Sequence, residues 1–269
     1  MKKTKISIVT VCMNAEKTIR YTLESVLNQT YIEFEYIVID GGSIDNTCGI
    51  IEEYLEKFEN KRILVKFISA RDKGIFDAMN KAVQLADGEW VIFINADDTF
   101  NSNNVLENVF NTNESYFGID VIYGNTVRIT GEKSILSKGK PIELMLRNMP
   151  FCHQSSFTRI GLIKEMPFDL SYIVSDYNFF LRSYLCGKKF KYIDITIANY
   201  SMEGFSNQNK YLTYLETINI KHDLGLINKN RFIQKLKNVY FKNLLTENLF
   251  LHKAIFLIDK VVKNRNIYK

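Results

Sequence analysis

Short apolar runs alternate with segments of helical periodicity over the first hundred residues. The β-branched run 6–11 precedes apolar positions that recur at helical spacing, namely Ile19, Leu23, Val26 and Leu27. Further apolar runs predict strands at 36–39, 63–68 and 90–94. Helices are predicted from Asp45 or Thr47 to Phe58 and over 75–86, and we expect Asn14 to cap the first helix. The pattern predicts an α/β fold with a doubly wound, mostly parallel sheet flanked by helices.

The alternation of strand and helix patterns is less regular in the second half of the chain. Residues 121–127 predict a strand, 131–141 a loop or hairpin, and 168–185 an irregular approach to a helix that begins near Asp176. After Asn207 the pattern is mostly helical. We therefore expect an α/β domain over 1–206 and a helical, basic extension over 207–269.

Composition restricts the class of protein. The 269 residues are 46% hydrophobic and 24% charged, which is typical of a globular protein and excludes disorder, collagen and coiled coil as descriptions of the whole chain. The four cysteines form no Cys-x-x-Cys pair, so the sequence favours neither a disulfide scaffold nor a zinc cluster. We expect no secretory signal, no membrane-spanning segment and a cytoplasmic location with reduced thiols.

Charge is unevenly distributed along the chain. Residues 229–269 carry ten Lys/Arg and two acids, a local charge of +8, so the remainder sums to −3 within the total of +5. A mildly acidic body argues against nucleic acid as a partner, because its basic patch would sit on the folded domain. The basic tail has apolar positions at Leu244, Leu245, Leu249, Ile255, Ile258 and Val262. It predicts either peripheral attachment to the anionic inner face of a membrane, or packing of this apolar side on the first domain or on a second subunit.

Polar side chains follow the predicted strands at their carboxyl ends. These clusters lie at 10–14, 40–43, 69–74 and 95–98. Ligands of doubly wound sheets bind at this edge, so we expect the clusters to converge there. An isolated pair such as Asp97 and Asp98 would more often cap a turn. Because Asp40 and Asp72 lie at two neighbouring strand ends, the pair instead favours a site for a hard divalent cation such as Mg²⁺ or Mn²⁺.

The segment Asp-Gly-Gly-Ser at 40–43 has two interpretations. It can form a simple turn, or it can offer Asp40 as an acceptor for a nucleobase imide or a ribose hydroxyl. It matches neither the dinucleotide fingerprint nor the phosphate loop with its Gly-Lys ending.

Four motifs together carry a family resemblance. They are IVTV with Asn14, EYIVIDGGSIDNT at 35–47, DKGIFDAMNK at 72–81, and GEW at 88–90 through NADD at 95–98. The later segments HQS at 153–155, Asp176-Tyr177 and GFS at 204–206 also fit. In this order they resemble family 2 glycosyltransferases of the GT-A fold, and the resemblance extends to about residue 206.

The resemblance implies roles for individual residues. Asp176 would be the catalytic base, Asp97 the leading metal ligand and Asp98 a supporting one, with Mn²⁺ or Mg²⁺ as cofactor. His153 and Ser206 would contact the diphosphate or the acceptor, and Asn95 stands where the family's Asp-x-Asp motif has its first acid. The nucleotide would be bordered by Thr10, Asn14, Asp40, Arg71, Asp72 and Asn95.

These roles predict an inverting, metal-dependent transfer of a sugar from a nucleoside diphosphate sugar, with UDP as the first choice, to a hydroxyl of a saccharide or lipid-linked saccharide. Such a reaction belongs to the assembly of cell-surface polysaccharide or glycolipid. A non-catalytic nucleotide-binding relative remains an alternative, because Asn95 departs from the family pattern. A sugar-phosphate nucleotidyltransferase is a second alternative, but residues 12–16 are not the glycine-rich basic loop that it requires.

Overall fold

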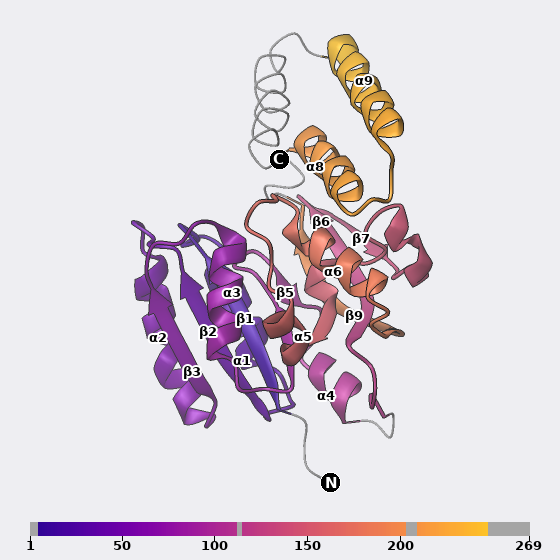
Figure 1. Ribbon diagram of the computed structural model, residues 1–269. Helices are drawn as coiled ribbons and strands as arrows, with labels where there is room; N and C mark the ends of the chain where they lie inside the picture. The colour runs from indigo at the N-terminus through magenta and orange to yellow at the C-terminus, as the bar shows by residue number, and fades with distance from the viewer. Residues whose placement is uncertain (1–4, 112–114, 203–208, 247–269) are drawn as a thin grey trace. The chain divides into compact units, whose positions relative to one another are not determined.

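The computed structural model describes residues 5–111, 115–202 and 209–246, except for the side chains of Lys210 and residues 240–246. The chain divides into two compact units, Met1–Gln208 and Asn209–Lys269. The larger unit has a first half, residues 5–111, and a second half, residues 115–202. Figure 1 shows its helices arranged around one curved sheet.

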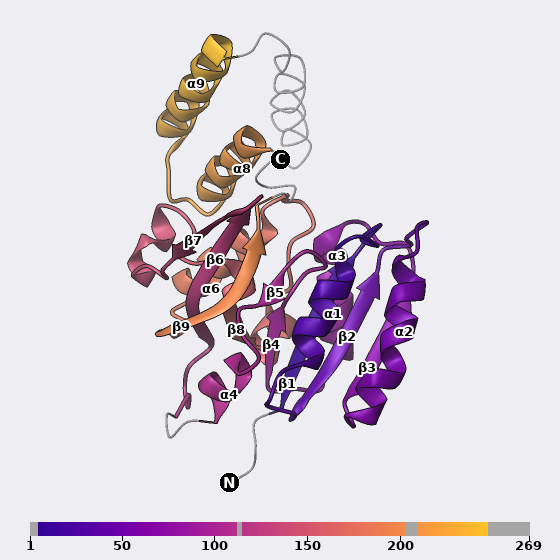
Figure 2. The same ribbon diagram turned by 180° about the vertical axis from the view of Figure 1, so that it is seen from behind.

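Strands and helices alternate through the first half, as the periodicity predicts. The strands are β1 (Ile6–Cys12), β2 (Phe34–Asp40), β3 (Leu64–Ser69), β4 (Trp90–Phe93) and the short β5 (Thr99–Phe100). The helices are α1 (Ile19–Leu27), α2 (Thr47–Asn60), α3 (Ile75–Leu85) and α4 (Val105–Phe110). β1 pairs in parallel with both β2 and β4, and β3 pairs in parallel with β2. All four carboxyl ends therefore reach one edge, uppermost in Figure 2.

The second half extends the sheet with mixed pairing. Its strands are β6 (Val121–Thr130), β7 (Lys133–Ser137), β8 (Ser156–Arg159) and β9 (Phe190–Ser201). Within the described residues the sheet runs in the order β3-β2-β1-β4-β8-β6-β9-β5, with β7 on β6. β8 joins the halves by antiparallel pairing with β4 and β6. The helical segments are α5 (Ile160–Glu165), α6 (Ser175–Leu185) and the 3₁₀ turns η1 (Ile142–Leu146) and η2 (His153–Ser155).

The core lies on both faces of the sheet because alternate strand residues point in opposite directions. On one face, Ile8 and Val38 pack with apolar residues of α1 and α2. On the other, α3 packs on β1 and β2 through its buried residues Ala78, Met79, Ala82 and Val83. The α3 layer is nearer the viewer in Figure 1, and α1 is nearer in Figure 2. This two-sided covering is the doubly wound arrangement that the sequence predicts.

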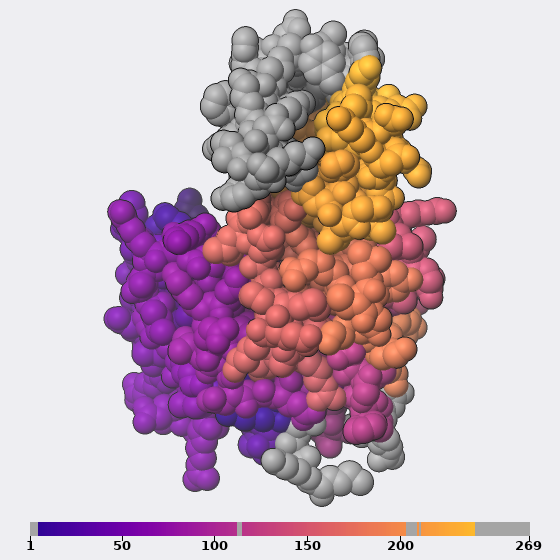
Figure 3. Space-filling view, in the orientation of Figure 1, coloured from indigo at the N-terminus to yellow at the C-terminus, as the bar shows by residue number. Residues whose placement is uncertain are grey.

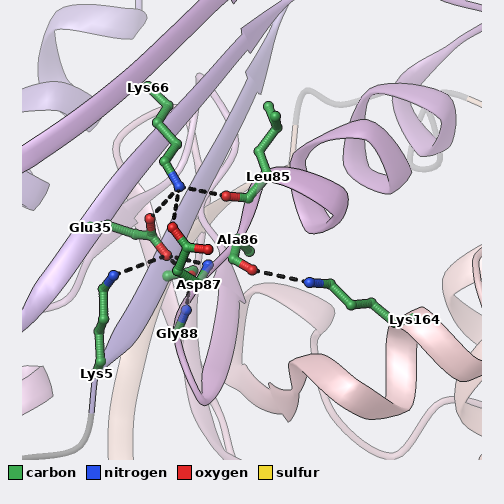
Figure 4. Close-up of polar contacts among 9 residues, drawn as sticks. Lys5, Glu35, Lys66, Leu85, Ala86, Asp87, Gly88 and Lys164 are labelled. Carbon is green, nitrogen blue, oxygen red and sulfur yellow. Dashed lines mark hydrogen bonds and ion pairs between the residues drawn. The ribbon is translucent and has the colours of Figure 1, made fainter.

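A charged cluster fastens the opposite, amino-terminal edge of the sheet (Figure 4). Glu35 is fully buried and pairs with Lys66 at 2.8 Å. Its Oε1 atom accepts hydrogen bonds from the Ser7 hydroxyl at 2.7 Å and the Asp87 backbone N–H at 2.6 Å. The cluster thus joins β1, β2, β3 and the loop after α3, away from the edge where the predicted site residues lie.

The smaller unit contains α8 (Lys210–Asp223) and α9 (Lys229–Thr246). The two helices pack together through buried Ile218, Ile227 and Val239. No helix within the described ranges is long and apolar enough to cross a membrane.

Candidate active site

Asp40 organises the loop that follows β2. Its side chain is fully buried, and Oδ2 accepts hydrogen bonds from the backbone N–H groups of Gly42 and Ser43 and from the Ser69 hydroxyl at 2.6 Å. Burial opposes ionisation, but the bonds from Ser43 and Ser69 outweigh it and lower the pKa of this carboxyl. The structure therefore places an ionised carboxylate in the wall of the predicted nucleotide site, already bonded to the protein. A direct contact with a nucleobase stays a prediction, and it requires one hydroxyl to turn away.

Asn14 does not cap a helix, so that prediction was wrong. Its φ angle is +51°, its Oδ1 atom accepts a hydrogen bond from the Ile44 N–H at 2.9 Å, and α1 begins only at Ile19. Asparagine tolerates this left-handed conformation better than most residues. Its backbone N–H donates to the Ser43 hydroxyl, so Asn14 joins the loops after β1 and β2.

Thr10 lies deeper than a ligand-binding side chain usually does. It is fully buried, donates to the Ile94 carbonyl at 2.7 Å and accepts from the Tyr36 hydroxyl at 2.8 Å. Its hydroxyl ties β1 to the residue that follows β4.

Two glycines allow the loops after β2 and β3 to approach closely. A Cβ atom on Gly41 would lie 2.7 Å from Asp72 Oδ2, and one on Gly42, whose φ is +89°, would lie 3.3 Å from Arg71 Cγ. Asp72 in turn accepts a hydrogen bond from the Gly74 N–H at 2.8 Å, just before α3 begins. Glycine is thus required for contact between the loops, and Asp40, Arg71 and Asp72 come together as predicted.

The loop after β4 carries two carboxylates, of which one is exposed and the other is buried. Asp97 is exposed, whereas Asp98 is 1% exposed. Asp98 Oδ1 accepts a hydrogen bond from the Ser201 N–H at the end of β9, and the Gln154 side chain also bonds this carboxyl. Burial and the neighbouring Asp97 raise the pKa of Asp98. The buried Asp98 side chain therefore holds this loop against β9 and η2. To bind a metal ion as predicted, it would have to break its hydrogen bonds to Ser201 and Gln154.

A divalent cation could bind at this loop only if a substrate supplied further ligands. Among the residues that the structure describes, no group of three or more His, Cys, Asp or Glu side chains could hold a metal ion by itself. Asp97 offers one exposed carboxylate, and Mg²⁺ commonly binds through one or two carboxylates plus substrate phosphates. Asn95, half-buried on the same loop, adds an amide whose Oδ1 has no hydrogen-bond partner among the described residues.

His153 and Asp176 come from the second half of the unit to the same region. The His153 ring is buried against Phe93 of β4, with ring centroids 5.1 Å apart. Burial lowers the pKa of His153, although the Asp176 carboxylate opposes that shift. Asp176 is half-buried in the first turn of α6, where the helix N-terminus stabilises a negative charge. A neutral imidazole and a carboxylate thus stand beside the strand that leads to Asp97.

Ser206 lies outside the described residues, and its predicted role stays a prediction. Sequence reasoning missed Gln154 and Ser201, which hold Asp98 from the second half. Gln154 follows His153 in a segment that the sequence analysis did single out, but no local pattern indicates its distant partner. The assembled loops bring together the hydrogen-bonded Asp40 carboxylate, the exposed Asp97 carboxylate and, from the second half, the half-buried Asp176 carboxylate.

The family comparison covers most of the larger unit. Residues 7–186 match the family model described as Glycosyl transferase family 2. That range contains β1 through α6, and therefore every site residue named above except Ser201 and Ser206.

Curated relatives agree with this assignment. A PGL/p-HBAD biosynthesis glycosyltransferase from Mycobacterium bovis is 28% identical over 225 residues, covering 82% of this chain and 86% of the relative. An uncharacterized glycosyltransferase from Methanocaldococcus jannaschii is 28% identical and covers 96% and 90%. Poly(ribitol-phosphate) beta-glucosyltransferase from Bacillus spizizenii is 31% identical over 51% of this chain, but the match spans only 22% of that protein.

Solved structures share the fold. S. aureus TarS in complex with UDP-GlcNAc superposes with a TM-score of 0.65 at 20% identity, covering 91% of this chain and 75% of TarS. A mannosyltransferase from Pyrobaculum calidifontis in complex with GDP-Man and Mn²⁺ also gives 0.65, at 12% identity, covering 100% and 82%. The curved, mixed sheet flanked by helices is the one these transferases share. The chain therefore belongs to glycosyl transferase family 2 and is a glycosyltransferase with a GT-A-type fold.

Proposed function

We propose that the protein transfers a sugar from a nucleoside diphosphate sugar to an acceptor hydroxyl, with inversion at the anomeric carbon. The observation that carries this proposal is the meeting of two carboxylate segments from different halves of the unit. Asp97 follows β4, and Asp176 interacts electrostatically with His153, whose ring packs on Phe93 of that strand. One carboxylate is thus available for the donor's diphosphate and another for the acceptor.

On the donor side, the loops after β1, β2 and β3 would bind the nucleoside. The Asp40 network fixes the backbone of Gly42 and Ser43, and Arg71 lies against Gly42. UDP is our first choice of nucleotide, supported by the family resemblance and by the complex of TarS with UDP-GlcNAc. We assign 1–206 to this catalytic domain and 207–269 to the extension.

A divalent cation, Mn²⁺ or Mg²⁺, would be held by Asp97 together with the donor's diphosphate. When bound, it would offset the negative charge that grows on the leaving diphosphate. Asn95 would offer its amide to the ribose. The complex of the Pyrobaculum mannosyltransferase with Mn²⁺ supports this choice of cofactor.

Asp176 would act as the general base. An acceptor hydroxyl is a weak nucleophile at neutral pH, so a carboxylate within hydrogen-bond reach must remove its proton during the attack. Burial lowers the pKa of His153, which disfavours an imidazolium whose positive charge would pair with the Asp176 carboxylate and weaken it as a base. A single displacement from the face opposite the leaving group inverts the configuration and needs no covalent nucleophile.

We further propose that the acceptor is a saccharide or a lipid-linked saccharide used for cell-surface polysaccharide or glycolipid. The names of the mycobacterial and Bacillus relatives, which refer to PGL and to poly(ribitol-phosphate), support this class. A lipid-linked acceptor would be met by a cytoplasmic enzyme held on the inner face of a membrane by the basic tail. The side chains of Leu244 and Leu245, and all of Leu249, Ile255, Ile258 and Val262, lie outside the described part of the structure.

A screen of donors tests the proposal. The full-length protein is incubated with UDP-glucose, UDP-GlcNAc or GDP-mannose, with and without Mn²⁺, and both binding and release of nucleoside diphosphate are measured. Each donor is tested with a panel of simple saccharides as acceptors and with water alone, so that the sugar leaves the diphosphate either for a saccharide hydroxyl or by hydrolysis. We expect one donor to bind more tightly with Mn²⁺ and to be turned over. Binding with no release under any condition would favour the non-catalytic relative instead.

A further inference from the structure

The Asn80 side chain joins the two halves of the larger unit. Asn80 lies on α3, and its amide Nδ2 donates to the Phe168 carbonyl at 2.9 Å. Its Oδ1 accepts from the Phe168 N–H at 3.0 Å. The amide therefore satisfies both backbone groups of one residue that lies 88 positions away in the sequence. Figure 3 shows the surfaces of these two halves side by side on the face toward the viewer.

Phe168 contacts four elements around the site, namely α3, β4, η2 and α6. It is 2% exposed, and its ring centroid lies 5.4 Å from Phe76 of α3 and 5.7 Å from Phe93 of β4. It also lies 5.7 Å from the His153 ring and 5.2 Å from Phe179 of α6. The position of Phe168 therefore affects β4, which leads to Asp97, the buried His153 ring, and α6, which has Asp176 in its first turn.

An asparagine is chemically suited to this junction. Only a side-chain amide offers one donor and one acceptor in the spacing of a peptide group. Because Phe168 is buried, losing the amide would leave a backbone N–H and a backbone carbonyl without partners. Two hydrogen bonds to one backbone also fix the orientation of the segment that leads to α6, which a packing contact alone would not do.

We propose that Asn80 is a positioning residue, which acts through Phe168 to hold the Asp176 helix in register with the donor-binding half. The inference rests on the proposed function, since it assumes that Asp176 serves as the base. Misplacement of a catalytic group by about 1 Å can cost on the order of 100-fold in rate. Loss of the Asn80 contacts should therefore slow turnover while donor binding persists.

The experiment uses the full-length protein with Mn²⁺ and UDP-glucose, or the donor with the fastest release in the screen above. Asn80→Ala removes both hydrogen bonds, and Asn80→Asp keeps the acceptor but replaces the donor. Lys164→Met is the matched control, because Lys164 also links the second half to α3, donating to the Ala86 carbonyl at 3.1 Å at the far edge of the sheet (Figure 4). Release of UDP, the Kd for UDP and the melting temperature are measured for each variant.

We expect both Asn80 variants to lower kcat by roughly 10- to 100-fold, with the Kd for UDP within about twofold of the original value. Lys164→Met should change kcat by less than about twofold, whatever it does to the melting temperature. A kcat near the original in a folded Asn80 variant would overturn the inference. So would a variant that loses folding or donor binding together with turnover, because Asn80 would then be structural. If Asp176→Asn is fully active, the proposed function itself fails, which is a different outcome.

Discussion

Asp97 is exposed to solvent, whereas its neighbour Asp98 is buried, so Asp97 is the carboxylate of this loop that a bound cation could reach. We expect Asp97→Ala to abolish the enhancement of UDP binding by Mn²⁺, because no second carboxylate on that loop is exposed. Titration calorimetry with and without Mn²⁺ measures the effect. Glu52→Ala, which removes an exposed carboxylate from α2, serves as the control. Unchanged enhancement in Asp97→Ala would remove this residue from the metal site.

At the scale of single residues, sequence reasoning located the site better than it described the contacts. The acids Asp40, Asp97 and Asp176 follow recognisable motifs, and the structure places all three at the same edge of the sheet or beside the strand that leads to it. The helix cap predicted at Asn14 was wrong because its side chain bonds Ile44, 30 positions away. Asn80 likewise reaches Phe168. Nothing local in a sequence specifies such partners.

Among the secondary-structure elements, the buried Glu35 links neighbouring strands, and its contribution to stability can be measured. Burial opposes its ionisation, yet the bonds from Lys66 and Ser7 outweigh it and lower its pKa. A carboxyl whose pKa is lowered by folding stabilises the protein above its unfolded pKa of about 4.3, and that contribution is lost as pH falls through the folded value. We expect Glu35→Gln to cost about 2 kcal/mol at pH 7, because it breaks an ion pair with one buried partner.

Urea unfolding of both proteins from pH 7 to pH 3 checks this prediction. The difference in free energy of unfolding should begin to shrink as the pH falls below about 4.3, where Glu35 is protonated first in the unfolded state. It should be lost once the pH is below the lowered pKa of the folded state, where Glu35 is neutral in both states. A difference that stays constant over the whole range would show that the charge of Glu35 contributes nothing.

The accuracy with which each helix or strand was predicted depends on how clear its hydrophobic pattern is. The four parallel strands and the helices between them were predicted within a few residues, because each strand is buried on both faces or carries a clear apolar run. The hairpin expected at 131–141 is confirmed in part, since β7 pairs with β6. β5, β8 and β9 were not predicted, because their pairing joins segments far apart in the chain and depends on the whole fold.

For the whole molecule, we predict that the basic extension attaches the protein to anionic lipid. Among the described residues of α9, Lys229, Arg231 and Lys237 are exposed basic side chains. We expect the full-length protein to bind vesicles that contain anionic lipid, and to lose binding as salt rises, because attraction of exposed charges is screened over about 8 Å at physiological ionic strength.

Charge-reversal variants distinguish vesicle binding through the extension from binding through the surface of the larger unit. Lys229→Glu combined with Lys237→Glu should weaken vesicle binding by about 30-fold, since each basic residue near an anionic surface contributes about 1 kcal/mol. Lys17→Glu with Lys133→Glu makes the same charge change at exposed sites on the larger unit. Equal weakening by both pairs, or no binding of the unmodified protein, would contradict attachment through the extension.

In the proposed transfer reaction, Asp176 removes the proton of the attacking hydroxyl. The most direct measurement is the turnover of Asp176→Asn at saturating donor, since this change keeps the size of the side chain and removes the proton acceptor. Asp169→Asn, which alters the nearest other carboxylate in the segment before α6, is the control. We expect kcat to fall by roughly 100- to 10,000-fold in Asp176→Asn, with donor affinity unchanged and the control nearly as active as the original. Near-normal turnover in Asp176→Asn would contradict the account.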